Sequence, residues 1–264
     1  MANYGIAIGI NHYTPPTSQG LKELKGAIQD ATEVYKWLIN EANVPVGNAR
    51  LVTSTLDPLR PDKTIVDTAI TEIIQLILNN GADADRFYFY FAGHGLGVER
   101  DSENNGMCMA NWNELMRNGT SLSSKSYKQK FLNEGLFKEV VMWLDCCRNT
   151  KVNMTPENNP GLTLMGQNLN PKWFVGYATQ YQSPAFESSV LTASGNETRG
   201  IFTRVLLEGL RGAAAKNGKP VNADDLRDHL RFYVPREAEK AGYLQKPDVY
   251  HNTDSFDLML FNQV

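Results

Sequence analysis

The chain has 264 residues, of which 42% are hydrophobic and 21% are charged, as in an ordinary globular protein. Its net charge is −3, so nothing in its composition favours nucleic acid or an anionic membrane as a partner, since both favour basic faces, and neither is expected. No apolar stretch approaches the ~18 residues of a membrane span, and the N-terminus lacks the charged region of a signal peptide, so none is predicted.

The first part of the chain alternates between strand and helix patterns. The segment 4–10 is short, apolar and contains β-branched residues, which predicts a buried strand. The segment 49–55 predicts a second strand. Apolar residues recur at intervals of three and four within 21–42 and 61–80, so we expect a helix in each. Residues 86–92 form an aromatic strand that is almost continuously apolar, as central parallel strands are.

The second part continues the alternation. Strands are predicted at 138–145 and 173–179, helices at 199–210 and 224–234, and an edge strand or packing tail at 249–261. Strands that alternate with helices are typical of an open α/β sheet, mostly parallel and covered on both faces. We expect one domain over residues 1–264, with no internal repeat or low-complexity linker.

Reactive side chains follow two of these strands. Gly93-His94-Gly95 follows the strand at 86–92, and Cys146 and Cys147 follow the strand at 138–145. Active groups in open α/β sheets gather at the carboxyl ends of strands. A reactive cysteine needs a nearby base or cation, and histidine is the usual partner. The two strand ends therefore predict a histidine–cysteine pair.

Other interpretations of these residues exist. A cysteine is more often a buried filler than a nucleophile, and a single histidine is usually structural. Zinc is disfavoured because adjacent cysteines lack ligand spacing and Cys108 is the only other thiol. A serine hydrolase would need a Gly-x-Ser-x-Gly elbow, which is absent. Three cysteines without a spaced framework favour free thiols in a reducing, cytoplasmic setting.

Several motifs in order resemble the caspase-like cysteine peptidases. FAGHG at 91–95 resembles the end of their histidine strand, and DCCR at 145–148 resembles the Asp-x-Cys signature of metacaspases and their bacterial relatives. The histidine lies about 50 residues before the cysteine, as that clan requires. Further similar segments are IAIGINHY, LKGAIQDA, ATQYQSPAFE and RGIFTRVLLEGL, so the resemblance covers about residues 4–212.

The resemblance implies a caspase-like α/β/α sandwich with a mostly parallel central sheet of about six strands. It also implies a cysteine endopeptidase that works through a thioester and a two-residue dyad. Cys147 is the third residue of Asp-x-Cys and thus the expected nucleophile, with His94 as its base. By analogy, the N–H groups of Gly95 and Cys147 form the oxyanion hole. Period-two alternation leaves Cys146 for packing.

The resemblance also implies which substrates bind. In metacaspases, acids at the positions of Asp30 and Asp145 line the first pocket, and two carboxylates there accept Arg or Lys and repel Asp. We therefore expect cleavage after basic residues, with Arg preferred over Lys if it pairs bidentately. Alternatively, Asp30 is a solvated helix position and Asp145 is a strand-end cap.

No cofactor is expected, although some metacaspases need calcium and the acidic segment 99–105 offers oxygen ligands. The segment 148–171 is rich in Asn and Pro, which favours a mobile loop. Self-cleavage is a hypothesis, either in this segment, whose few basic residues are Arg148 and Lys151 at its start, or at Lys125, Lys128 or Lys130. Expected partners are a protein or peptide substrate and an activating protein. Because no recruitment domain precedes residue 4, that protein would act in trans.

Two other functions stay open. The first is a catalytically silent caspase-like binding or scaffold module, against which the retention of both His94 and Cys147 argues. The second is a different thiol hydrolase or acyl transferase on the same sheet. The style of the motifs suggests a bacterial effector of cell death or defence.

Overall fold

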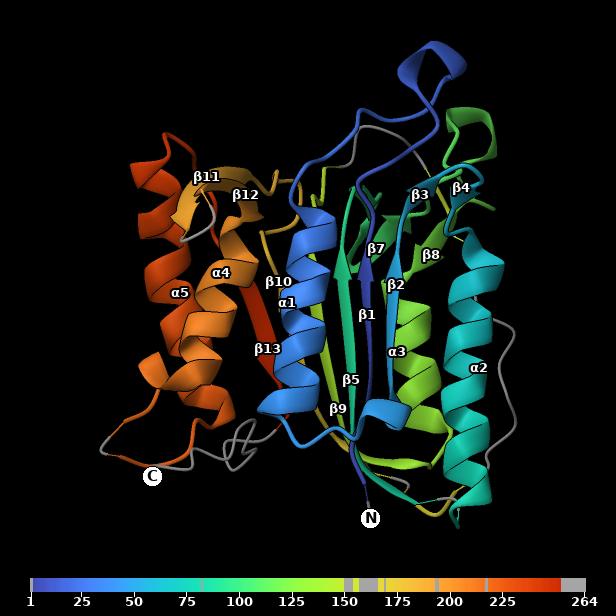
Figure 1. Ribbon diagram of the computed structural model, residues 1–264, viewed down its shortest axis with the longest axis vertical. Coiled ribbons are helices and arrows are strands. Elements are labelled where there is room, and N and C mark those ends of the chain that lie inside the picture. The colour runs from blue at the N-terminus through green and yellow to red at the C-terminus, as the bar shows by residue number, and fades with distance from the viewer. Residues whose placement is uncertain are drawn as a thin grey trace.

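A six-stranded sheet forms the centre of the computed structural model, which describes residues 2–81, 83–149, 154–156, 166–168, 170–192, 195–216 and 218–252 (Figure 1). Its strand order is β13-β10-β9-β5-β1-β2, and only the edge strand β13 runs antiparallel. The strands are β1 (Tyr4–Gly9), β2 (Ala49–Thr53), β5 (Ala84–Ala92), β9 (Phe137–Asp145), β10 (Lys172–Tyr177) and β13 (Asp248–His251). The predicted mostly parallel sheet of about six strands is therefore confirmed.

Helices cover both faces of this sheet. One face packs against α1 (Ala27–Asn40), α4 (Ile201–Glu208) and α5 (Ala223–Lys240), and the other against α2 (Lys63–Asn79) and α3 (Ser124–Asn133). Figure 1 shows α1, α4 and α5 on the left of the view and α2 and α3 on the right. The arrangement is the predicted α/β/α sandwich.

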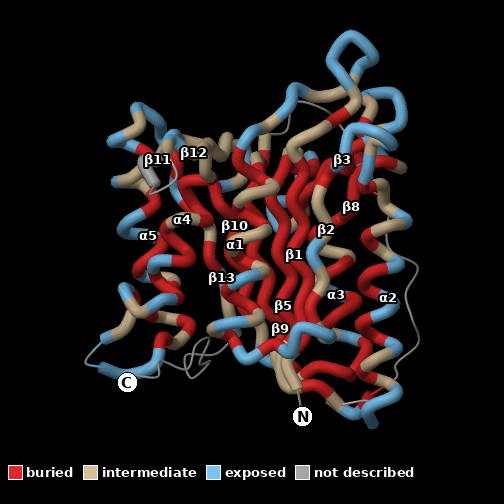
Figure 2. Tube along the Cα trace, viewed as in Figure 1, coloured by how far each residue is buried: buried red, intermediate tan, exposed pale blue. Residues whose placement is uncertain are grey.

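The alternation of side chains along β5 explains the two cores. Phe87, Phe89 and Phe91 pack with α2 and α3, whereas Tyr88 and Tyr90 pack with α1 and α4. Successive residues of a strand point to opposite faces, so a strand covered on both sides is apolar at every position. Figure 2 shows the resulting buried centre.

Small sheets extend beyond the central one. They are β3 (Thr55–Leu56) with β4 (Leu59–Arg60), then β6 (Gly95–Val98), β7 (Asp101–Cys108) and β8 (Ser121–Ser123), and the hairpin of β11 (Glu187–Thr192) and β12 (Gly195–Gly200). Short helical turns lie at Pro16–Ser18, Val46–Asn48, Glu114–Met116 and Gly209–Ala213. The small sheets were not predicted as such, because they depend on pairing between segments rather than on local pattern.

Three helices begin later than their patterns predict: α2 begins at Lys63 instead of residue 61, and α1 and α4 are also shifted. Residues 21–26 precede α1 instead of forming its first turns, because Leu21 N–H donates to the carbonyl of Thr14 and Leu24 N–H to that of Asn11. Residues 199 and 200 belong to β12, and α4 begins at Ile201. For α1 and α4, tertiary hydrogen bonds outweigh local helix preference.

The acidic segment 99–105 is largely part of β7, and Asp101 pairs with Lys125 at 3.1 Å. The proposed cut sites Lys125, Lys128 and Lys130 all lie within α3, where the backbone is folded and disfavours cleavage. Lys151 and the tail at 253–261 lie outside the described residues. In the described part of the chain, no helix is long and apolar enough to cross a membrane.

Candidate active site

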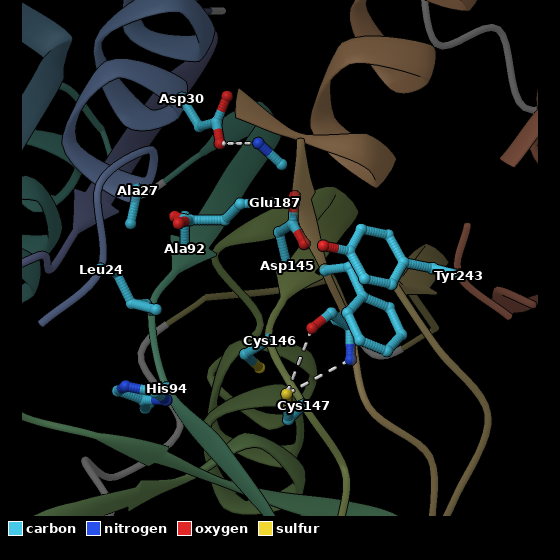
Figure 3. Close-up of a pocket in the computed structure, with 14 residues that line it drawn as sticks. Leu24, Ala27, Asp30, Ala92, His94, Asp145, Cys146, Cys147, Glu187 and Tyr243 are labelled. Carbon is cyan, nitrogen blue, oxygen red and sulfur yellow. Dashed lines mark hydrogen bonds between the residues drawn. The ribbon is translucent and has the colours of Figure 1, made fainter. Parts of the chain in front are cut away.

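The two predicted reactive residues follow neighbouring strands at matching positions. Ala92 of β5 pairs with Asp145 of β9, and Gly93 N–H donates to the carbonyl of Asp145 at 3.2 Å. His94 and Cys147 each lie two residues beyond this pair, at the carboxyl ends of the strands. Both line one cavity of about 310 Å³, shown in Figure 3. The two strand ends thus bring these side chains to one cavity.

Backbone and ring contacts hold His94 in place. Its N–H donates to the hydroxyl of Tyr13 at 2.7 Å, and the two rings meet edge-on with centroids 4.9 Å apart. Nε2 lies 2.8 Å from the carbonyl oxygen of Lys22. Burial lowers the pKa of the imidazole below its usual value, although the Lys22 carbonyl opposes this shift. The ring is therefore neutral at pH 7.

The sulfur of Cys147 contacts the backbone of a loop that follows β10. It accepts a hydrogen bond from Ala185 N–H at 3.2 Å, and the thiol donates to the carbonyl of Ala185 at 3.5 Å. Figure 3 shows both contacts. Nε2 of His94 likewise faces a carbonyl, so both groups are bonded to neighbouring backbone.

The other two thiols are buried. Cys146 is 2% exposed, belongs to the core beside α2 and α3, and accepts a hydrogen bond from Asn105 Nδ2 at 3.0 Å. Burial raises the pKa values of Cys146 and Cys108 above the usual thiol range. Both are therefore protonated at neutral pH. Among the three cysteines, only Cys147 is partly exposed.

Gly95 lies directly against the cysteine pair. A methyl group at this position would be 2.6 Å from the carbonyl oxygen of Cys147 and 2.7 Å from the sulfur of Cys146. Such distances are far inside van der Waals contact, so the site requires glycine here. Gly95 thus brings the backbone that follows His94 against the backbone of Cys147.

Asp30 is buried at the first turn of α1 and lines the same cavity. Its Oδ1 accepts from Arg199 Nε at 2.5 Å, and its Oδ2 accepts from Gly200 N–H at 2.6 Å. Burial raises its pKa to about 7 against the effect of Arg199, and the charge of Asp145 adds to the increase. With 1% of its surface exposed, Asp30 is not the solvated helix position considered as an alternative.

Asp145 lines the cavity and also caps a helix. Its Oδ2 accepts from the N–H and the hydroxyl of Thr203, at 3.1 and 2.6 Å, in the first turn of α4. Burial raises its pKa to about 6, although the bonds from Thr203 lower it. Asp30 and Asp145 converge on Gly200, where an added methyl group would be 2.9 and 2.3 Å from their respective Oδ2 atoms.

A third acid, Glu187, lines the cavity and was not singled out from the sequence. Its carboxylate accepts from Gly26 N–H at 2.7 Å and from Lys25 N–H at 3.2 Å, at the start of α1. Figure 3 shows Glu187 near Asp30 and Asp145, with His94 and Cys147 on either side of Cys146 below them. The only sequence signal for Glu187 was its place at the end of the ATQYQSPAFE motif.

The residue after Cys147 anchors this strand end. Arg148 is fully buried, and its Nη1 donates to Asp248 Oδ2 at 2.9 Å and to the carbonyl of Thr179 at 3.3 Å. Its guanidinium also lies over the ring of Tyr177, 4.1 Å from the centroid. The ion pair joins the end of β9 to the edge strand β13.

No group of three or more His, Cys, Asp or Glu that would hold a metal occurs among the described residues. In particular, Asp101 of the segment considered for calcium is paired with Lys125.

Comparison with known proteins identifies the family. The profile of the caspase domain peptidases matches residues 3–258. The chain belongs to the caspase domain family. A curated relative, described as a probable protease of a Desulfuromonadales bacterium, is 32% identical over 251 residues, which cover 88% of this chain and 28% of the relative. This caspase domain thus corresponds to about a quarter of that protein's length.

Solved structures agree on the fold. Caspase-1 from Spodoptera frugiperda is 12% identical with a TM-score of 0.58, covering 96% of this chain and 86% of its own. A protein from Geobacter sulfurreducens, also 12% identical, has a TM-score of 0.57 and covers 99% of this chain and 98% of its own. At this identity the likeness shows the caspase-like fold. The caspase domain assignment supports cysteine peptidase activity in general terms.

Proposed function

We propose that this caspase domain is a cysteine endopeptidase that cleaves after basic residues, using His94 and Cys147. The observation that carries the proposal is the cavity in which these two side chains meet Asp30, Asp145 and Glu187. A thiol and an imidazole supply the chemistry of amide hydrolysis, and the carboxylates supply a preference for cationic side chains.

The reaction proceeds in two steps. The sulfur of Cys147 attacks the scissile carbonyl carbon while its proton passes to His94, and the C–N bond breaks as His94 returns that proton to the leaving amine. This leaves a thioester on Cys147. Water, deprotonated by His94, then attacks the thioester and releases the acid product, and the sulfur recovers its proton.

The N–H groups of Gly95 and Cys147 are the proposed donors to the oxyanion. The close contact of Gly95 with the Cys147 carbonyl supports this assignment, because it sets the two backbone segments side by side. In other peptidases, a donor of this kind contributes roughly 2.7–4 kcal/mol to the barrier reduction.

Asp30 and Asp145 are the proposed substrate-binding acids. Both are buried at the cavity and approach the same point at Gly200, so a cation entering there would lie near two carboxylates. The raised pKa values of both acids indicate that the protein's own hydrogen bonds and charges do not fully offset the cost of burying each carboxylate. An Arg side chain would compensate them better than Lys, because its planar guanidinium pairs bidentately.

Cleavage of a peptide library by the wild type, Cys147→Ala and Asp145→Ala tests the proposal. We expect wild-type cleavage after Arg and, less often, Lys, no cleavage by Cys147→Ala, and a loss of the basic preference in Asp145→Ala. Parallel reactions with and without calcium would reveal a metal requirement. Cleavage after acidic or apolar residues would refute the specificity, and no cleavage of any peptide would favour the binding-module alternative.

The proposal extends to a bacterial role in cell death or defence. If proteolysis drives such a role, expression of the wild type should slow bacterial growth more than expression of Cys147→Ala at equal protein levels. Equal growth of the two strains would count against it.

A further inference from the structure

A basic side chain of the protein itself already contacts the proposed substrate pocket. Arg199 lies on β12, and its Nε donates to Asp30 Oδ1 at 2.5 Å. Only 12% of its side chain is exposed. The second oxygen of Asp30 accepts the N–H of the next residue, Gly200. Both oxygens of Asp30 are therefore engaged by β12.

This contact has the chemistry of the proposed substrate. A substrate arginine would pair its guanidinium with the same carboxylate, and Asp30 cannot form the same close pair with two guanidinium groups at once. Arg199 itself is not among the residues that line the cavity. We propose that Arg199 is an internal occupant of the Asp30 carboxylate, from which a basic substrate side chain must displace it. The inference rests on the proposed preference for basic residues.

The reactive groups are also bonded to the chain's own backbone. The sulfur of Cys147 contacts both backbone groups of Ala185, and Nε2 of His94 contacts the carbonyl of Lys22. Together with Arg199 on Asp30, these contacts give the sulfur, the imidazole and the specificity acid each an intramolecular partner.

The position of Arg199 makes its displacement feasible. The β11–β12 hairpin forms a sheet separate from the central one, and its other strand is anchored independently through Glu187 at Lys25 and Gly26. The Nη2 atom of Arg199 is buried without a hydrogen bond to any described residue, so the internal pair leaves a donor unsatisfied. A peptide side chain that satisfies more of its donors can compete with it.

The main test is the kinetics of an Arg peptide with the wild type, Arg199→Gln and Arg211→Gln. Arg211 is the matched control, because it pairs with Glu41 at the other end of α1, at 3.1 Å and well away from the cavity. If substrate binds only those molecules in which Arg199 has left Asp30, its apparent dissociation constant is the intrinsic constant divided by the fraction of such molecules. We expect Arg199→Gln to lower KM at least fivefold with little change in kcat, and Arg211→Gln to match the wild type.

Direct binding provides a second readout. Benzamidine, a small amidinium probe, should bind Cys147→Ala at least fivefold more weakly than it binds the double variant Cys147→Ala/Arg199→Gln, as measured by calorimetry. Thermal melting verifies that each variant is folded. Equal KM and equal benzamidine affinity would overturn the inference, and so would an activity loss in Arg199→Gln that Arg199→Lys restores, because that pattern marks a structural clamp.

The two proposals fail in different ways. If the wild type cleaves after Arg and Arg199→Gln behaves identically, Arg199 does not compete with the substrate, and the proposed preference for basic residues stands. If neither protein cleaves after basic residues and neither benzamidine titration shows binding, the specificity itself is wrong.

Discussion

Ala92 and Asp145 are direct neighbours in the parallel ladder between β5 and β9, and this pairing fixes the register of everything beyond them. His94 and Cys147 both lie two residues further along, so the proposed base and nucleophile leave the sheet at the same level. A slip of one residue between the strands would send one of the two side chains to the opposite face.

The first prediction separates the adjacent cysteines. Cys147→Ala should reduce hydrolysis of an Arg peptide by at least about a thousandfold, because it removes the proposed nucleophile. Cys146→Ala should retain most activity and lose roughly 1 kcal/mol of unfolding free energy, because it truncates a buried side chain. Kinetics and urea denaturation of both variants provide the measurement. Full activity in Cys147→Ala together with loss of activity in Cys146→Ala would show that Cys146 is the nucleophile.

The second prediction concerns the protonation of His94. Because burial disfavours the imidazolium form, its NMR titration midpoint in Cys147→Ala should fall below the usual value of about 6.5. His94→Ala should lower kcat of the otherwise unmodified protein by about 10²-fold or more. A midpoint above 6.5, or full activity in His94→Ala, would contradict the proposed role.

The third prediction is a pH dependence of stability. Asp30 and Asp145 have pKa values raised to about 7 and about 6, so the folded state retains protons that the unfolded chain releases above its ordinary carboxyl pKa near 4. Their contribution to stability is therefore present at low pH and is lost as pH rises through 6 to 7. Asp145→Asn removes one of the two carboxyl titrations.

Urea denaturation at pH 5 and pH 7.5 measures this effect. The decrease in unfolding free energy from pH 5 to pH 7.5 should be smaller in Asp145→Asn than in the wild type, by about 1 kcal/mol. Arg211→Gln, which leaves the pocket intact, should show the wild-type decrease. If the unfolding free energy of all three proteins depends on pH in the same way, the pKa of Asp145 is not raised in the folded state.

The fourth prediction uses the crowded position at Gly200. Gly200→Ala places a methyl group against Asp145 and Asp30, so we expect a loss of about 1–3 kcal/mol of stability and impaired cleavage after Arg. Gly47→Ala is the control, since an added methyl group there meets nothing within 4 Å. Melting curves and peptide kinetics compare the two. Equal behaviour of the variants would show that the acids move apart freely.

The residues that could be predicted are those whose signal is local. The apolar runs of β5 and β9 placed His94 and the adjacent pair Cys146 and Cys147 at strand ends, and the resemblance to Asp-x-Cys then selected Cys147. The β7 strand was missed because its sequence DSENNGMC is polar at first and its structure depends on pairing with β6 and β8. Glu187 was missed because its partners at Lys25 and Gly26 lie more than 160 residues earlier.

The same limit applies to Asp30. Its position in the LKGAIQDA motif indicated a pocket residue, but the contact with Arg199 spans 169 residues, and no periodicity in the sequence encodes it. Long-range ion pairs of this kind follow from the assembled fold, whereas strand ends follow from the pattern of each strand.

The buried ion pair between Arg148 and Asp248 sets a limit on how far the chain can be shortened. Asp248 belongs to β13, the last strand of the described chain, yet its carboxylate neutralises the cation next to the proposed nucleophile. A chain ending before Asp248 would leave a guanidinium enclosed without its counter-charge, at a cost of about 3–5 kcal/mol. Proteolytic trimming from the carboxyl end should therefore inactivate the protein once it passes this residue, although the removed segment lies on the far edge of the sheet.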